Sequence, residues 1–153
     1  MGRFATPVSG EARVTILDTN VLSELMAQLP SQIVLAWISS QRVSGPLFTT
    51  TITVAEILYG IELLPAGKRR DRLQFEAEAM FGEDFSGRIL PFDLESARAL
   101  PAIAAGRRRR GRPMAEFDAQ IAAIAVVHGA TLATRNTSDF DGCGIRLLNP
   151  WLD

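Results

Sequence analysis

The chain has 153 residues, of which 47% are hydrophobic and 22% charged, so it suits one globular domain with a buried core. Its formal net charge of −1 excludes binding of polyanions through overall charge, so any nucleic-acid contact must come from a local basic patch. Cys143 is the only cysteine, which excludes an internal disulfide and a multi-cysteine zinc site and is typical of a reducing compartment.

The N-terminal stretch and the apolar runs indicate neither export nor membrane insertion. Residues 1–13 contain no apolar segment of the signal-peptide type, and we expect a mobile leader there because glycine and proline disfavour helix and strand. The longest apolar run, residues 121–127, is far shorter than the ~20 residues that span a bilayer. The sequence therefore predicts a cytoplasmic protein without a membrane partner, and a single domain over residues 14–153.

Short apolar segments alternate with segments of helical periodicity along the chain. The first strand, residues 14–17, leads into a polar corner at residues 18–20, and apolar residues then recur at helical spacing. Further strands are predicted at residues 47–50, 88–92, 131–134 and 145–148. Further helices are predicted around residues 33–38 and at 53–64, 68–81, 94–105 and 117–127. This alternation predicts right-handed crossovers and a three-layer α/β/α domain with a five-stranded parallel sheet.

Local signals refine three of these boundaries. Thr53 and Glu56 have the spacing of a capping box, which places the start of the third helix at Thr53 and Glu56 in its first turn. Pro101 predicts a kink or a break in the helix over residues 94–105. Residues 106–113 are predicted to form a basic loop.

Four acidic residues fall at one edge of the predicted sheet. Asp18 follows the first strand, and Glu56 lies near the start of the helix after the second strand. Asp118 opens the helix that leads into the fourth strand, and Asp139 follows that strand. In a parallel crossover fold all four positions lie at the carboxyl ends of the strands, where open α/β sheets bind ligands.

Each acid also has a purely structural explanation. Asp18 or Asn20 could cap a helix, Glu56 and Asp118 could balance the positive end of a helix dipole, and Asp139 could form a turn. These explanations do not account for their convergence, because clustered carboxylates disfavour each other's ionisation unless a cation joins them. Mg²⁺ and Mn²⁺ prefer all-oxygen sites, so the pattern favours metal-dependent phosphoryl chemistry.

Four sequence motifs, in this order along the chain, resemble the successive motifs of the PIN domain. They are LDTN at residues 17–20, TVAE at 53–56, FDAQIAA at 117–123 and TRNTSDF at 134–140. The ending LNPW at residues 148–151 is similar to the bacterial toxins of the VapC and FitB type. The resemblance implies a Mg²⁺- or Mn²⁺-dependent ribonuclease that acts as the toxin of a toxin–antitoxin pair.

The resemblance also implies roles for individual residues. The metal-binding acids of the family match Asp18, Glu56 and Asp118, and the fourth position falls on Asn136 or Asp139, of which we favour Asp139. Supporting polar residues of the family match a second group: Thr19, Asn20 and Thr134, with Asn136 close by. The expected partners are an RNA substrate and a cognate VapB-like antitoxin that binds a groove of the early helices. The expected assembly is a homodimer or a toxin–antitoxin hetero-oligomer.

A cluster of five arginines precedes the helix that carries Asp118. It could grip RNA phosphates at the active edge, or it could be a solvated helix end that favours the helix dipole. The sequence leaves both interpretations open for Arg107, Arg108, Arg109, Arg110 and Arg112.

Two other function classes compete with the nuclease interpretation. A phosphotransfer domain could use Asp18 as nucleophile, but it would want a second aspartate where Asn20 stands and a late lysine, whereas Lys68 is the only lysine. A non-catalytic module that binds RNA or protein is the other alternative, and the complete set of acids argues against it.

Overall fold

The computed structural model describes residues 14–153, so the predicted leader, residues 1–13, lies outside the described residues. Five parallel strands form one sheet in the order β3-β2-β1-β4-β5. Their bounds are β1 Thr15–Leu17, β2 Leu47–Thr50, β3 Ile89–Leu90, β4 Thr131–Ala133 and β5 Arg146–Leu148. The predicted five-stranded parallel sheet is confirmed, with β3 shorter than expected.

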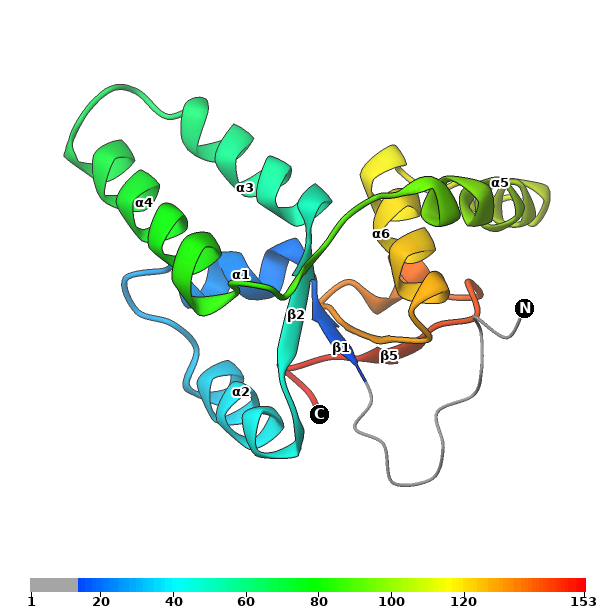
Figure 1. The fold of residues 1–153 in the computed structure, drawn as a ribbon, viewed down its shortest axis with the longest axis horizontal. Coiled ribbons are helices and arrows are strands. Elements are labelled where there is room, and N and C mark those ends of the chain that lie inside the picture. The colour runs from blue at the N-terminus through cyan, green and yellow to red at the C-terminus, as the bar shows by residue number, and fades with distance from the viewer. Residues whose placement is uncertain (1–13) are drawn as a thin grey trace.

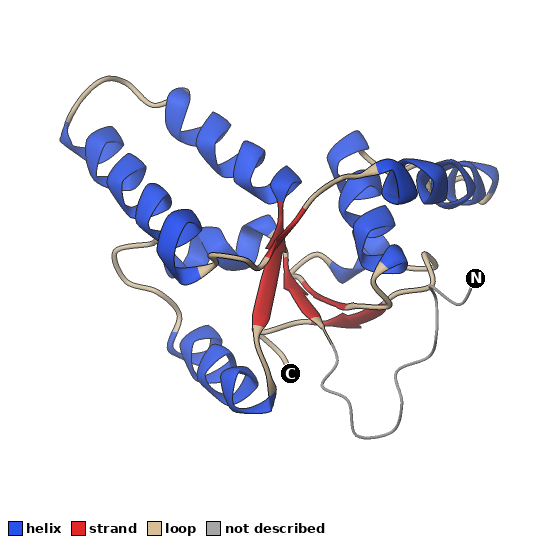
Figure 2. Ribbon diagram, in the orientation of Figure 1, coloured by secondary structure: helices blue, strands red, loops and turns tan. Residues whose placement is uncertain are grey.

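Helices cover both faces of this sheet (Figure 1). On one side lie α1 Thr19–Leu25, α2 Gln32–Ser44, α3 Thr51–Glu62 and α4 Lys68–Ala79, which continues into the π-helical turn η1 Met80–Asp84. On the other side lie α5 Leu94–Arg109 and α6 Glu116–Val127, and the 3₁₀ turn η2 Thr137–Phe140 connects β4 to β5. Figure 2 shows the strands between the two groups of helices, which confirms the three-layer α/β/α architecture.

Alternating side chains of the central strands build two separate apolar cores. In β1, Leu17 packs into the core beneath α1, α2 and α3, whereas Ile16 packs into the core beneath α6. In β4, Ala133 packs into the same core as Leu17, and Leu132 packs into the same core as Ile16. Because successive residues of a strand face opposite sides, both sides of these strands must be apolar when helices cover both faces.

The strand order reverses between β1 and β4. The chain moves outward from β1 to β2 and β3, then returns through α5 and α6 to β4 on the other side of β1. The backbone N–H of Asp18 donates to the carbonyl of Ala133 over 2.9 Å, so the ends of the two strands remain joined there. Such a switch point leaves a crevice at the carboxyl ends of the strands.

The capping-box prediction for α3 is wrong. Thr50, still in extended conformation at the end of β2, is the N-cap, and its hydroxyl accepts the N–H of Thr53 over 3.1 Å. The helix therefore begins at Thr51 and Glu56 lies in its second turn. Strand β2 passes directly into α3, so the last strand residue also caps the helix and the later threonine is inside it.

The predicted break near Pro101 and the predicted basic loop are also wrong in part. Helix α5 continues past Pro101 to Arg109, so three of the five arginines belong to its last turn. Its length is supported by packing against α6, which outweighs the loss of one backbone donor at proline. In residues 14–153, no helix has the length and apolar character needed to cross a bilayer.

Candidate functional site

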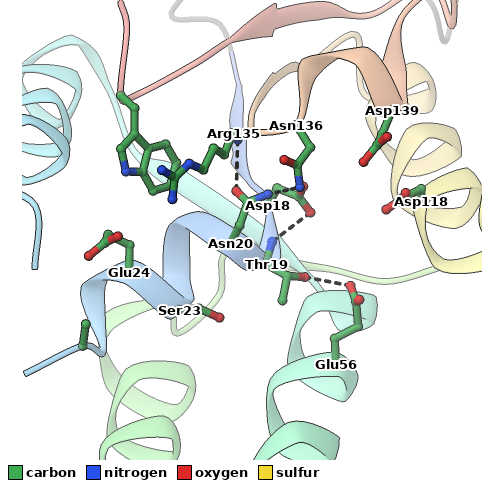
Figure 3. A pocket seen from close by; sticks show the side chains of 12 residues that line it. Asp18, Thr19, Asn20, Ser23, Glu24, Glu56, Asp118, Arg135, Asn136 and Asp139 are labelled. Carbon is green, nitrogen blue, oxygen red and sulfur yellow. Dashed lines mark hydrogen bonds between the residues drawn. The ribbon is translucent and has the colours of Figure 1, made fainter.

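A pocket of about 570 Å³ opens at the switch point (Figure 3). Its walls come from the residues after β1, β4 and β5, from α1 and η2, and from the first two turns of α3 and α6. The predicted site residues that line it are Asp18, Thr19, Asn20, Glu56, Asp118, Asn136 and Asp139. Thr134 is fully buried behind the pocket wall. The structure thus brings together residues that are up to 121 positions apart in the sequence.

Asp18 is held at the floor of the pocket and is only 5% exposed. One carboxylate oxygen accepts the N–H of Thr19 over 2.8 Å, which makes Asp18 the N-cap of α1. The other accepts the hydroxyl of Thr134 over 2.8 Å and lies 3.4 Å from the amide nitrogen of Asn20. Burial raises the pKa of Asp18, and the hydrogen bonds from Thr134 and Thr19 oppose that increase.

Glu56 reaches the same space from α3. Its Oε1 accepts a hydrogen bond from the hydroxyl of Thr19 over 2.7 Å, and that hydroxyl lies 3.1 Å from the hydroxyl of Thr53. The hydroxyl of Thr53 in turn contacts that of Thr50 at 3.4 Å. A row of threonine hydroxyls therefore fixes where the Glu56 carboxylate lies relative to α1.

Asp118 in the first turn of α6 and Asp139 in η2 complete the acidic set. The pKa of Asp118 is raised to about 6, first by burial and then by the negative charges of Asp18, Asp139 and Glu56, while the charge of Arg107 lowers it. Within residues 14–153, the ion pairs are Arg70–Glu62, Arg72–Glu76 and Arg112–Asp141, so none neutralises any of the four acids. The carboxylates therefore repel one another across the pocket.

The four acids are not already drawn together around one point. In the described part of the chain, no three Asp, Glu, His or Cys side chains form a compact group that could hold a metal ion. Mg²⁺ keeps several waters and is usually bound through one or two carboxylates, so it does not need all four acids in direct contact. The all-oxygen donors and their unrelieved repulsion suit a hard divalent cation.

The arginine cluster has a structural role that the sequence did not reveal. Arg107 is 4% exposed, and its guanidinium donates to the carbonyls of Arg112 and Asp141, each over 2.7 Å. Arg110 donates to the carbonyl of Gly142 over 2.9 Å, and Arg112 donates to that of Ser138 over 3.1 Å. These three side chains hold the segment that carries Asp139.

The other two arginines of the cluster, Arg108 and Arg109, are exposed in the last turn of α5. A contact with RNA phosphates stays a prediction for the cluster, and Arg110 and Arg112 are exposed as well.

Among the pocket residues that sequence reasoning missed as site candidates, two form a pair. Arg135 and Trp151 both line the pocket, and the Arg135 guanidinium carbon lies 4.8 Å from the centre of a Trp151 ring. Both residues are inside the quoted motifs TRNTSDF and LNPW, so their place in those motifs was the available signal. Their proximity could not be read from residue types alone.

Comparisons with known proteins show which family the chain resembles. The PIN domain model matches residues 15–142. The chain is 43% identical to "VapC ribonuclease Y4jK" of Sinorhizobium fredii, covering 89% of this chain and 96% of the relative. It is 38% identical to "Toxin FitB" of Neisseria gonorrhoeae, covering 90% and 99%. The solved structure of FitAB bound to an IR36 DNA fragment matches with a TM-score of 0.83 at 37% identity, covering 90% and 96%. By its motifs, its fold and these relatives, the chain belongs to the PIN-domain family.

Proposed function

We propose that this PIN-domain protein is a Mg²⁺- or Mn²⁺-dependent endoribonuclease and the toxin of a toxin–antitoxin pair. The observation that carries the proposal is the convergence of four acids in one pocket, none of them in an ion pair within residues 14–153. Burial, and after it the charges of the other three acids, raises the pKa of Asp118 to about 6. The similarity to a protein named as a VapC ribonuclease and to one named as Toxin FitB supports both parts of it.

Asp18, Glu56, Asp118 and Asp139 would hold the ion. When bound, a divalent ion supplies a water of lowered pKa and positive charge against the phosphate. The chain's own contribution is orientation, since Thr19 and Thr134 fix the carboxylate of Asp18 by hydrogen bonds before any ligand arrives.

The reaction is the addition of water across one phosphodiester linkage of RNA. The water oxygen bonds to phosphorus, the bond from phosphorus to the 3′ oxygen breaks, and that oxygen takes up a proton. The products are a 3′-hydroxyl and a 5′-phosphate, as the resemblance to the family implies. The pocket's acids repel free phosphate oxygens, so binding of the substrate depends on the cation.

A cognate VapB-like antitoxin is the proposed protein partner. A second groove of about 600 Å³ lies between α1, α3 and α4 and shares Thr19, Ser23, Ala27 and Glu56 with the acidic pocket. Apolar side chains line it, and Arg69 and Arg72 stand at its wall. An antitoxin segment seated there would reach the acids directly. The assembly that we propose is a homodimer or a toxin–antitoxin hetero-oligomer.

Cleavage of single-stranded RNA by the purified protein tests the proposal. The wild-type protein should cut RNA in Mg²⁺ or Mn²⁺, and cleavage should stop when EDTA is added. The cleavage rate of Asp18→Asn should be at least about a hundredfold lower, while its circular dichroism spectrum should match that of the wild type. Asp71→Asn makes the same chemical change at an exposed position of α4 and should cut like wild type. Sequencing of RNA ends after brief expression of wild type and Asp18→Asn would identify the target RNA.

Three results would contradict this function. An Asp18→Asn variant that cuts RNA without a divalent ion would exclude the proposed role of the acids. RNA binding with no cleavage in either metal would favour a non-catalytic binding module. A phosphate trapped covalently on Asp18 would favour a phosphotransfer domain.

A further inference from the structure

The acidic pocket contains one arginine side chain that forms no ion pair with the four acids. Among the described residues that line the pocket, Arg135 is the only basic one. Its backbone is tied on both sides: the N–H donates to the side-chain oxygen of Asn20 over 3.1 Å, and the carbonyl accepts from the side chain of Asn149 over 3.3 Å. The start of the Arg135 side chain is therefore fixed relative to the hydrogen-bond network around Asp18.

The guanidinium of Arg135 is held by an aromatic face. It lies 4.8 Å from the centre of a Trp151 ring, and the backbone N–H of Trp151 donates to the side chain of Asn149 over 2.9 Å. Trp151 also packs partly against the larger apolar core. One residue, Asn149, thus ties the backbones of both partners together.

The guanidinium keeps its own donors available. In residues 14–153, it has neither an ion pair nor a side-chain hydrogen bond, although the carboxylate of Glu24 lines the same pocket beside the four acids. A guanidinium in such surroundings would be expected to pair with a carboxylate, but stacking on Trp151 holds it by its face and leaves its N–H edge free. A free, oriented guanidinium edge matches the oxygens of a phosphate.

We propose that Arg135 binds an RNA phosphate next to the scissile linkage, and that Trp151 positions its guanidinium for this contact. In Figure 3, Arg135 lies on one side of Asp18 while Asp118 and Asp139 lie on the other, so a strand reacting at the acids also extends toward Arg135. The inference rests on the proposed ribonuclease function and adds a subsite to it. The contact is with the backbone, so it fixes the strand without reading its sequence.

Steady-state cleavage of a fluorescent single-stranded RNA in Mg²⁺ tests the contact. Arg135→Gln should raise KM about tenfold and change kcat less than about threefold, because a non-scissile phosphate is bound equally in the ground and transition states. The slope of log(kcat/KM) against log[NaCl] should fall by about 0.7, the value for one phosphate of a single strand. Arg98→Gln, an equal charge change at an exposed position of α5, should leave KM, kcat and slope unchanged.

Substitutions of Trp151 test its positioning role. Trp151→Leu should raise KM nearly as much as Arg135→Gln, whereas Trp151→Phe, which keeps an aromatic face, should stay near wild type. In an Arg135→Gln background, Trp151→Leu should add less than about twofold, because its effect passes through Arg135. Thermal melts of all variants separate this effect from loss of core packing.

The possible outcomes are distinct. An Arg135→Gln variant with wild-type KM and salt slope would overturn the contact, and so would a large loss in kcat at unchanged KM, which would place Arg135 at the scissile phosphate. Equal effects of Trp151→Leu with and without Arg135 would overturn the positioning role. If wild type shows no metal-dependent cleavage at all, the proposed function fails, and the subsite fails with it.

Discussion

The carboxyl group of Asp118 connects the electrostatics of the pocket to the stability of the fold. Its pKa is about 6 in the folded protein against 3.8 for the free side chain, because burial and three neighbouring acids disfavour its charge. The folded state therefore binds this proton more tightly than the unfolded state. By linkage, the contribution of Asp118 to stability is most favourable below pH 4 and is lost as the pH rises through about 6.

Replacing Asp118 by asparagine should therefore stabilise the metal-free protein at neutral pH. At pH 7.5 in EDTA, Asp118→Asn should raise the free energy of unfolding by about 1–3 kcal/mol, since each pKa unit corresponds to 1.36 kcal/mol. At pH 3.5, where the aspartic acid is mostly protonated in both states, the two proteins should differ little. Urea unfolding at the two pH values measures this, with Asp71→Asn as the control that should gain nothing. A loss of stability at pH 7.5 would contradict the repulsion described here.

Single residues in this site have two structural roles at once. The sequence could predict their positions but could not tell which role each residue has. Asp18 was open to two explanations, helix cap or site residue, and the structure shows it as the N-cap of α1 on the floor of the pocket. Asn20 likewise contacts Asp18 and also accepts the backbone N–H of Arg135. Residue type and order along the chain predict such positions, but they do not separate the two roles, because one carboxylate can serve both.

At the scale of elements, the segment between β4 and β5 depends on α5. This segment carries Asp139 and has only the short turn η2 as regular structure. Three arginines from the end of α5 and the loop after it donate to the carbonyls of Ser138, Asp141 and Gly142. The end of one helix therefore determines where an acid of the pocket lies.

Removing the central arginine of this clamp should loosen the segment. Arg107→Met keeps the length and apolar stem but leaves two carbonyls without donors, which should cost about 1–3 kcal/mol of stability. Hydrogen exchange of the amides in residues 138–142 should accelerate more than elsewhere in the chain. Arg108→Met, one residue away and exposed, is the matched control and should change neither quantity. Unchanged exchange in Arg107→Met would show that the segment is held by other contacts.

The sequence could not predict this clamp. Pro101 and the run of arginines from residue 107 locally favour an interrupted helix and a solvated loop, and only packing of α5 against α6 extends the helix to Arg109. The partners of Arg107 are backbone carbonyls, one of them 34 residues away, and residue types carry no signal for such contacts. The start of α3 was misplaced for a related reason, because Thr50 and Thr53 are both suitable caps and the length of β2 decides between them.

At the scale of the whole molecule, the pocket joins the two halves of the fold. Glu56 comes from a helix on one face of the sheet, whereas Asp118 and Asp139 come from elements that pack on the other side or follow β4. Asp18 lies between them at the reversal of strand order. This arrangement was predictable, since alternating strands and helices place all strand ends at one edge whatever the exact boundaries of each element.

A divalent ion in this pocket should therefore stabilise the whole molecule, independently of any catalysis. At a concentration 100 times its Kd, Mg²⁺ or Mn²⁺ should add about 2.7 kcal/mol to the free energy of unfolding and raise Tm by about 5–10 °C. Asp18→Asn and Glu56→Gln should each lose most of this increase, because each removes one carboxylate ligand of the ion. Asp18 lies at the centre of the sheet edge, and Glu56 comes from α3 on one face of the sheet. Glu78→Gln, exposed on α4, should keep it. The quantity compared between variants is the increase in Tm on adding metal, and not Tm itself. Replacing an acid of the pocket relieves repulsion and should raise Tm even without metal. An increase of the same size in both Asp18→Asn and Glu56→Gln would contradict binding of the ion by these acids.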